Sequence, residues 1–310
     1  MTDIDKTELM GLSVSFCGHW LRSPLVLASG TWGETAEQLV NAVNQGCGGV
    51  TTKSCGTEPT DGHNEPNLLN WSHGLINAIG LRSRGVNVMC HTIMETVEQT
   101  PKNGNILIAS VFGDEYTVVR AARRVEKADP DLIELNLSCP NRDGVMLCEG
   151  PAIVSDVTAR VVGDVRTPVV VKLAPNVPDI GAVAAAAVEA GASAICAINT
   201  MPGMVVNVHN GRPTLSNGSG GISGAALKPI ALKAVWDVRA ACPDIPIIGT
   251  GGVWNGDDVI DMMSVGADVV GLGSVMLLRG PNAVAQIAQE LWDRLRRDGL
   301  KLSDVHNRAH

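Results

Sequence analysis

Short apolar runs alternate with helix-like segments along the chain, from about residue 24 to the C-terminus. Each run is bounded by Gly or Pro, which indicates strands that are buried on both faces. Eight strands are predicted in this way, over residues 24–30, 48–53, 105–111, 132–137, 168–173, 194–200, 246–252 and 268–274. Helices are predicted between them, two of them over residues 35–45 and 116–127. Eight strands separated by helices predict an α/β fold, a closed (β/α)8 TIM barrel.

Two long connections follow the second and the sixth predicted strand. Residues 54–81 and 201–224 are rich in Gly, Asn, Pro and Thr, and they are too long for simple turns. Because both begin at the C-terminal end of a strand, we expect long loops over the C-terminal face, where barrel active sites lie. Residues 1–23 are expected to form a short hairpin or strand that closes the opposite end. The whole chain, 1–310, is then a single barrel domain.

The composition excludes several classes of protein. Hydrophobic residues make up 45% of the chain, which is ample for a core, and the net charge of -8 without a long run of Lys or Arg argues against nucleic-acid binding. The N-terminus has no apolar segment typical of a secretory signal, and no apolar run is long enough to span a membrane. The eight cysteines are scattered without Cys-x-x-Cys pairs, which fits reduced thiols and offers no metal-ligand set. We therefore expect a cytoplasmic protein that holds no metal.

The fourth predicted strand runs directly into a group of polar residues. It is followed by Ser138, Cys139, Pro140 and Asn141, and the proline ends the sheet ladder. Cys139 therefore lies at the C-terminal end of a barrel strand and is a candidate catalytic thiol. The alternative is a small buried hydrophobic residue, which is what most free cysteines are. The amide side chains of Asn136 and Asn141 beside it favour the catalytic interpretation.

Glycines cluster at the ends of the last two predicted strands, in residues 249–252 and 271–274. Backbone N–H groups in such loops, followed by a helix, form the phosphate site that is common in these barrels. The alternative is a pair of tight turns that need positive φ. No Gly-x-Gly-x-x-Gly follows the first strand, which excludes a dinucleotide-binding fingerprint.

Two lysines stand in otherwise apolar strands, Lys53 at the end of the second and Lys172 within the fifth. Neither strand offers a nearby Asp or Glu, so we expect each lysine to meet a ligand anion or an electron-rich cofactor edge. The alternative, an ammonium that reaches solvent, is less fitting for Lys172 than for Lys53. Amide and hydroxyl side chains also gather at strand ends and loops, where they suit a planar ligand such as a pyrimidine or serve only as turn formers. They are Asn77, Asn136, Asn141, Asn199 and Thr200.

Taken together, these motifs resemble the class 1 dihydroorotate dehydrogenases. The resemblance runs from about residue 12 to 285 and rests on residues 28–31, 52–54, 77–81, 136–141, 171–173, 198–200 and 220–224 and on the two glycine sets. Residues 220–232 are similar to the class 1B catalytic subunit rather than to the fumarate-using class 1A enzymes. The resemblance implies an FMN-binding (β/α)8 barrel that oxidises (S)-dihydroorotate to orotate in de novo pyrimidine biosynthesis.

The resemblance also implies roles for individual residues. FMN contacts are implied for Ser29, Lys53, Ser54, Ser110, Asn136, Lys172, Ile198, Gly224, Gly251, Gly252, Gly273 and Ser274. Orotate contacts are implied for Lys53, Asn77, Ala78, Ile79, Gly80, Leu81, Asn136, Asn141, Asn199 and Thr200. Cys139 would be the base that removes the C5 proton while hydride passes from C6 to flavin N5, and Lys53 would hold the substrate carboxylate.

The chain departs from the family pattern at two places. Ser110 stands where the family commonly has an Asn that touches the flavin, and Cys148-Glu149 stands where class 1B usually has Phe-Gly. Two alternatives therefore remain, a dihydropyrimidine dehydrogenase acting on dihydrouracil or dihydrothymine and an FMN-binding barrel without catalysis. Asn141 favours a carboxylated substrate.

Class 1B enzymes pass electrons to NAD through a second subunit that carries FAD and a 2Fe-2S cluster. This chain has neither a cysteine cluster motif nor a dinucleotide fingerprint. The resemblance therefore implies a homodimer that depends on such an electron-transfer subunit for NAD reduction.

Overall fold

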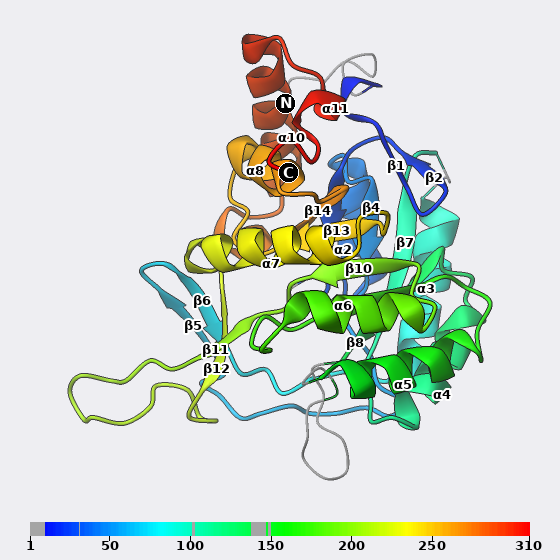
Figure 1. Ribbon diagram of the computed structural model, residues 1–310. Coiled ribbons are helices and arrows are strands. Elements are labelled where there is room, and N and C mark those ends of the chain that lie inside the picture. Colours follow the sequence, from blue (N-terminus) through cyan, green and yellow to red (C-terminus); the bar gives the residue numbers. More distant parts are fainter. Residues whose placement is uncertain (1–9, 31, 101–102, 138–146, 148–149) are drawn as a thin grey trace.

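The computed structural model describes residues 10–310, except residues 31, 101–102, 138–146 and 148–149. Its centre is a closed parallel barrel of eight strands in the order β10-β13-β14-β3-β4-β7-β8-β9 (Figure 1). The barrel strands are β3 (Leu25–Leu27), β4 (Gly49–Thr51), β7 (Ile106–Val111), β8 (Leu132–Asn136), β9 (Val169–Leu173), β10 (Ala194–Ala197), β13 (Ile247–Thr250) and β14 (Val269–Leu272). The predicted (β/α)8 barrel is confirmed.

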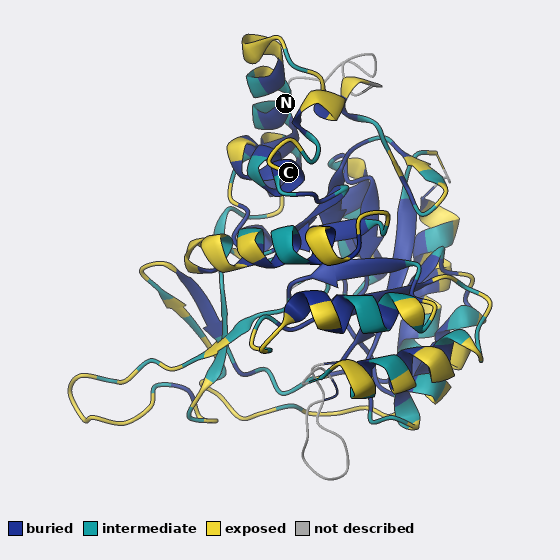
Figure 2. Cartoon of the chain, viewed as in Figure 1, coloured by how far each residue is buried: buried dark blue, intermediate teal, exposed yellow. Residues whose placement is uncertain are grey.

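Helices surround the barrel and bury one face each against the strands, as Figure 2 shows by their exposed outer faces. The two helices predicted by range are confirmed: Thr35 caps the first by accepting from Gln38 N, and Tyr116 and Lys127 flank the second. The α-helices are α2 (Ala36–Asn44), α3 (Val86–Gln99), α4 (Thr117–Glu126), α5 (Pro151–Val162), α6 (Ile180–Glu189), α7 (Lys228–Ala241), α8 (Gly256–Ser264), α9 (Val275–Leu278), α10 (Ala283–Asp298) and α11 (Leu302–Val305). Two short 3-10 helices are η1 (Met10–Leu12) and η2 (Ala225–Leu227).

The N-terminal half of the barrel interior is apolar. Alternate residues of each strand point inward, and the inward set includes Ile108, Leu132 and Val170. Phe16 and Leu21, from the hairpin of β1 (Val14–Phe16) and β2 (His19–Leu21), pack into the same cluster. The hairpin lies at the N-terminal strand ends, because Arg22 N donates to Gly104 O at 2.8 Å, just before β7.

The C-terminal half of the same interior is polar. Ser110 on β7 pairs in register with Glu134 on β8, and Asn136 pairs with Lys172 on β9. All four are buried. Because residues in register on neighbouring strands share a face, these side chains converge inside the barrel mouth.

The barrel strands end earlier than predicted. The second predicted strand was expected to reach Lys53 and the sixth to reach Thr200, but β4 ends at Thr51 and β10 at Ala197. At Lys53 and Thr200 the backbone N–H groups donate to acceptors outside the barrel sheet. Lys53 N donates to Gly33 O, and Thr200 N donates to the Oδ1 atom of Asn199. Both residues therefore stand above the barrel mouth, not within its strands.

The two long connections are not simple loops. They form a four-stranded antiparallel sheet in the order β11-β12-β6-β5, which lies beside the barrel in Figure 1. Its strands are β5 (Leu68–Trp71), β6 (Gly74–Asn77), β11 (Met201–Gly203) and β12 (Gly220–Ser223). Ile76, Ala78 and Leu215 form a small core of their own. Pairing between such distant segments is non-local, so residue periodicity within either connection gave no sign of it.

Within the described part of the chain, no helix is both long and apolar enough to span a bilayer. The same residues contain no cluster of His, Cys, Asp or Glu side chains that could hold a metal ion. The described cysteines at positions 17, 47, 55, 90, 196 and 242 are all free thiols.

Candidate active site

A buried carboxylate lies at the centre of the polar barrel mouth. The Glu134 residue is only 1% exposed. Its Oε1 atom accepts hydrogen bonds from Ser110 Oγ at 2.7 Å and from Ser29 Oγ at 2.9 Å. Lys172 Nζ donates to Ser29 Oγ at 3.0 Å and lies 4.0 Å from the same carboxylate oxygen. These four residues form one continuous network of charge and hydrogen bonds.

A second arm of hydrogen bonds leads from this network toward the mouth. Ser110 Oγ lies 2.8 Å from Ser54 Oγ, and Asn136 Nδ2 donates to Ser54 Oγ at 3.1 Å. Asn199 Nδ2 in turn donates to Asn136 Oδ1 at 3.1 Å. Ser110 has no exposed surface, and its side chain is held by Ser54 and Glu134. The flavin contact predicted for Ser110 stays a prediction.

Cys196 lies beside this network but is not a thiolate. It pairs in register with Lys172, and its Sγ atom is 3.8 Å from Thr250 Oγ1. Burial, followed by the nearby Glu134 carboxylate, raises the pKa of Cys196 to about 12. Burial likewise raises the pKa of Cys55, near the end of β4, to about 12. Neither thiol is suited to act as a base near neutral pH.

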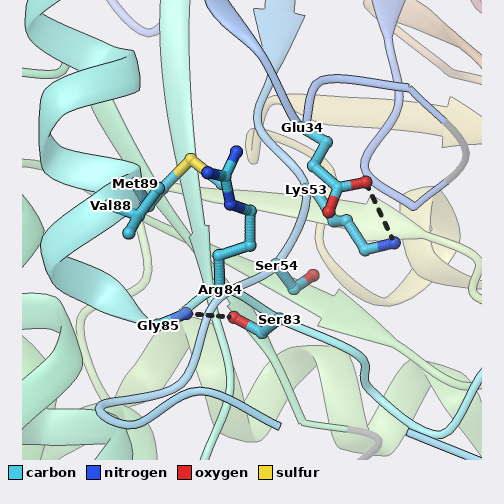
Figure 3. Close-up of a pocket in the computed structure, with 8 residues that line it drawn as sticks. All are labelled: Glu34, Lys53, Ser54, Ser83, Arg84, Gly85, Val88 and Met89. Carbon is cyan, nitrogen blue, oxygen red and sulfur yellow. Dashed lines mark hydrogen bonds and ion pairs between the residues drawn. The ribbon is translucent and has the colours of Figure 1, made fainter. Parts of the chain in front are cut away.

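Lys53 stands in a different environment, at one side of a surface pocket. Figure 3 shows Lys53 and Glu34 on one side of this pocket, with Arg84 and the first turn of α3 on the other. Lys53 Nζ lies 4.0 Å from Glu34 Oε2. Burial lowers the pKa of Lys53, Glu34 opposes that shift, and the Arg82 charge adds to it. The pocket is lined by Glu34, Lys53, Ser54, Ser83, Arg84, Gly85, Val88 and Met89.

Both lysines therefore have carboxylate partners, which the sequence analysis did not foresee. The partner of Lys172 is Glu134 on the neighbouring strand, and that of Lys53 is Glu34 on the loop after β3. The argument that each lysine must meet a ligand anion for want of a carboxylate was wrong. For each lysine, the carboxylate comes from another element that lies beside it in space.

The segment predicted to hold the substrate is built on the small sheet. Asn77 ends β6 and pairs with Gly221 on β12, whose carbonyl accepts from Asn77 Nδ2 at 3.4 Å. A Cβ at Gly221 would meet Thr200 Oγ1 at 2.1 Å, so only glycine lets Thr200 lie against this strand. The structure therefore brings Asn77 and Thr200 to the same small region.

The backbone after Asn77 turns sharply. Ala78 is buried, and its carbonyl lies 3.1 Å from His63 Nδ1. Gly80 and Leu81 both have positive φ, at 74° and 54°. Thr60 Oγ1 donates to the Leu81 carbonyl at 2.6 Å. The segment that includes Ile79 is thus fixed from both sides rather than free.

The glycines at the ends of β13 and β14 lie next to each other, because the two strands pair. Gly251 and Gly252 have φ values of 136° and 75°, and a Cβ at Gly252 would meet Lys228 N at 2.5 Å. Gly224, which precedes η2, has a φ of 90°. The φ values agree with the turn interpretation for Gly251 and Gly252, and Gly224 needs glycine for the same reason. The FMN contacts implied for these three glycines stay predictions.

Gly273 differs from those three glycines. Its φ is not positive, and a Cβ there would meet only Ala28 Cβ, at 3.9 Å. Open space beside its backbone, with Ser274 at the start of α9, fits the approach of a ligand. Nearby Lys228 is held by Asp258 and by Asp261, the latter at 2.7 Å. A phosphate here would therefore be met mainly by backbone N–H groups.

Several predicted residues lie outside the described part of the chain. They are the predicted base Cys139, the predicted substrate ligand Asn141, and the divergent pair Cys148 and Glu149. Ile198 is described: it is buried directly after β10, and its N–H donates to Thr250 O at 2.9 Å.

Sequence reasoning missed Glu134, Glu34 and Arg84. Glu134 could have been found, because it precedes Asn136 by two residues in a predicted strand and so shares its face. A glutamate in an otherwise apolar strand also indicates a buried partner. Glu34 and Arg84 lie in loops, where the sequence carries no comparable signal.

Comparisons with known proteins identify the family of the chain. The family described as dihydroorotate dehydrogenase matches residues 11–295. The catalytic subunit of dihydroorotate dehydrogenase B (NAD(+)) from Methanocaldococcus jannaschii is 37% identical, over 96% of this chain and 98% of the relative. The protein of the same name from Methanocella arvoryzae is 39% identical, over 97% of this chain and 98% of the relative. The resemblance to the class 1B catalytic subunit is confirmed.

A solved structure shares the fold. The dihydroorotate dehydrogenase of Eimeria tenella, crystallised with ferulenol, has a TM-score of 0.85. Its sequence is 22% identical, and the match covers 97% of this chain and 89% of that one. This likeness shows the fold alone. Because the family match spans residues 11–295 and the relatives match over nearly their full length, the chain belongs to the dihydroorotate dehydrogenase family.

Proposed function

We propose that this chain oxidises (S)-dihydroorotate to orotate in de novo pyrimidine biosynthesis, with FMN as its cofactor. The observation that supports this most is the cluster at the C-terminal barrel mouth, where Lys172, Asn136 and Asn199 converge and where Ser54, next to Lys53 in the chain, joins the same hydrogen-bond network. Nearly full-length relatives that carry the name dihydroorotate dehydrogenase B support it as well. We take residues 1–310 as one FMN-binding barrel, with 1–23 as its closing segment.

The residues at the mouth fit FMN. Gly273 has open space beside its backbone, and the adjoining loops suit a phosphate. The buried donors of Asn136 and Lys172 suit the acceptor atoms of a flavin ring. Residues that would hold FMN are Ser29, Lys53, Ser54, Asn136, Lys172, Ile198, Gly224, Gly251, Gly252, Gly273 and Ser274. When bound, FMN supplies the acceptor for the hydride that leaves substrate C6.

The protein's own residues bind and orient the substrate. Lys53 would attract the substrate carboxylate with its ammonium charge. Asn77, Asn199 and Thr200, with the backbone of residues 78–81, would fix the ring by hydrogen bonds. Cys139, as thiolate, would remove the proton from C5. Closely packed β6 and β12 would keep these groups in place and keep water out.

The names of the relatives also bear on partners. The relatives are named as catalytic subunits of dihydroorotate dehydrogenase B (NAD(+)). We propose that this chain works as a homodimer with an electron-transfer subunit that carries FAD and a 2Fe-2S cluster. The purified chain alone should reduce dyes but not NAD, and addition of that subunit should restore NAD reduction.

The proposed activity can be tested by anaerobic reduction of the bound flavin with dihydroorotate, dihydrouracil and dihydrothymine. Dihydroorotate should reduce the flavin fastest. Cys139→Ser should keep FMN bound and slow reduction by roughly 10²–10⁴-fold, as expected for a lost general base. Cys90→Ser, which changes a thiol on α3 instead, is the control and should leave the rate unchanged. Reduction by dihydrouracil but not by dihydroorotate would overturn the proposal.

A further inference from the structure

Two arms of side-chain hydrogen bonds at the barrel mouth run toward Glu134. Ser110 gives its only hydroxyl hydrogen to Glu134, so Ser54 must be the donor to Ser110. Ser54 accepts from Asn136, and Asn136 accepts from Asn199. On this arm, each side chain donates to the next one nearer the carboxylate.

The other arm has the same direction. Lys172 donates to Ser29, and Ser29 donates to Glu134. Lys172 has no acceptor atoms, so this arm has one possible direction only. Both arms therefore end on a single oxygen, Oε1 of Glu134.

A carboxylate suits the end of both arms, because its oxygens have acceptor sites only. An amide oxygen at the same place could still accept from both serines, but it would carry no charge. Lys172, 4.0 Å away and 5% exposed, compensates the buried negative charge. Replacing Glu134 by Gln would therefore keep an acceptor for both arms and leave the Lys172 cation without its partner.

We propose that Glu134 is a positioning residue that fixes the hydrogen-bond direction of the barrel mouth and sets the net charge at the proposed FMN site. The Asn136 carbonyl oxygen accepts from Asn199, and its amide group donates to Ser54. The orientation of the Asn136 side chain toward a ligand is therefore fixed. The Lys172 charge acts on the ligand only as far as Glu134 leaves it uncompensated. This inference rests on the proposed FMN site.

The test uses Glu134→Gln, which keeps the shape and removes the charge. Sulfite forms an adduct with the flavin ring that a nearby positive charge stabilises. We expect at least tenfold tighter sulfite binding in the FMN-loaded variant, and a rise in flavin midpoint potential of about 30 mV for each tenfold change in a two-electron couple. The double variant Glu134→Gln/Lys172→Gln should return both values toward the wild type.

A matched control is Glu95→Gln, which removes one exposed carboxylate on α3 and should change neither value. Ser110→Ala tests the hydrogen-bond arm separately, because it keeps the Glu134 charge. It should weaken orotate binding several-fold and leave sulfite affinity unchanged. If Glu134→Gln does not retain FMN, this second variant still decides whether the arm positions the mouth.

Unchanged sulfite affinity and potential in FMN-loaded Glu134→Gln would overturn the charge part of the inference. Unchanged orotate affinity in Ser110→Ala would overturn the positional part. A wild-type protein that binds no FMN would instead contradict the proposed function, so the two failures are distinguishable.

Discussion

The two lysines at the barrel mouth, Lys172 and Lys53, differ in how deeply they and their carboxylate partners are buried. The Lys172 side chain is 5% exposed and faces Glu134, which is 2% exposed. The Lys53 side chain is 14% exposed and faces Glu34, which is 34% exposed. Both pairs have the same separation of 4.0 Å, so distance alone does not distinguish them. What differs is how readily another group can replace the carboxylate.

Because of this difference, we expect Lys172 to have a structural role and Lys53 a role in ligand binding. Glu134 is enclosed by strands and accepts from two serines, so it cannot turn away from Lys172. Glu34 stands on a loop at the rim of a pocket, so an incoming anion can take its place beside Lys53. The first pair is a permanent part of the barrel, and the second is a site with an exchangeable counter-ion.

The largest expected effect comes from breaking the enclosed pair. Lys172→Met would leave the Glu134 charge buried without compensation, and we expect the free energy of unfolding to fall by about 3–5 kcal/mol. Equilibrium urea unfolding measures this. Lys233→Met, which breaks an exposed i,i+4 pair with Asp237, is the control and should cost at most about 0.5 kcal/mol. A loss as small as the control's would show that Glu134 is not held as a buried anion.

Removing the other lysine should affect binding rather than folding. Lys53→Ala should weaken orotate binding by about 1.5–3 kcal/mol, the value of a charge-assisted contact, and uracil binding far less. Ligand titration followed by the flavin absorbance measures both constants. Equal weakening of the two ligands would mean that Lys53 does not bind the carboxylate, and it would favour the dihydropyrimidine alternative.

The pH dependence of binding should report on Lys53 alone. Its pKa is lowered below the usual 10.5 mainly by burial, so its proton is lost at a lower pH than that of an ordinary lysine. Orotate affinity should be full below the lowered pKa and fall as pH rises through it, by about tenfold per pH unit. Lys53→Arg, which stays charged, should remove this fall below pH 10.5. A wild-type fall that persists in Lys53→Arg must come from another group.

The smallest effect is expected from the exchangeable carboxylate. Glu34→Gln removes the anion that competes for Lys53, so orotate should bind more tightly near neutral pH, by about 0.2–1 kcal/mol. Because Glu34 supports the charged form of Lys53, the gain should shrink as pH rises. Glu37→Gln, an exposed change on α2, serves as the control. Weaker orotate binding in Glu34→Gln at neutral pH would show that Glu34 helps the ligand instead.

Features set by neighbouring residues in the chain could be predicted from the sequence, and most features set by contacts between distant residues could not. The barrel strands could be predicted because each is a local apolar run between Gly or Pro residues, and each buries both faces. The sheet of β5, β6, β11 and β12 could not, since its strands are short and pair across distant parts of the chain. Lys172 was found as a cation in an apolar strand, and its partner Glu134 could have been found from the predicted barrel, in which the fourth and fifth strands are neighbours. The pairing of Lys53 with Glu34 could not, because both residues lie outside the strands.

The small sheet joins two segments, far apart in the chain, that we propose contact the substrate. β6 leads into residues 77–81, β12 lies against Thr200, and the Ile76, Ala78 and Leu215 core holds them together. Its strands and its small core are separate from the barrel interior, with its apolar base and its Glu134–Lys172 pair. We therefore expect that a substrate preference can be transferred between related barrels only by exchanging both connections together, because either one alone would leave its half of the sheet without matching partners.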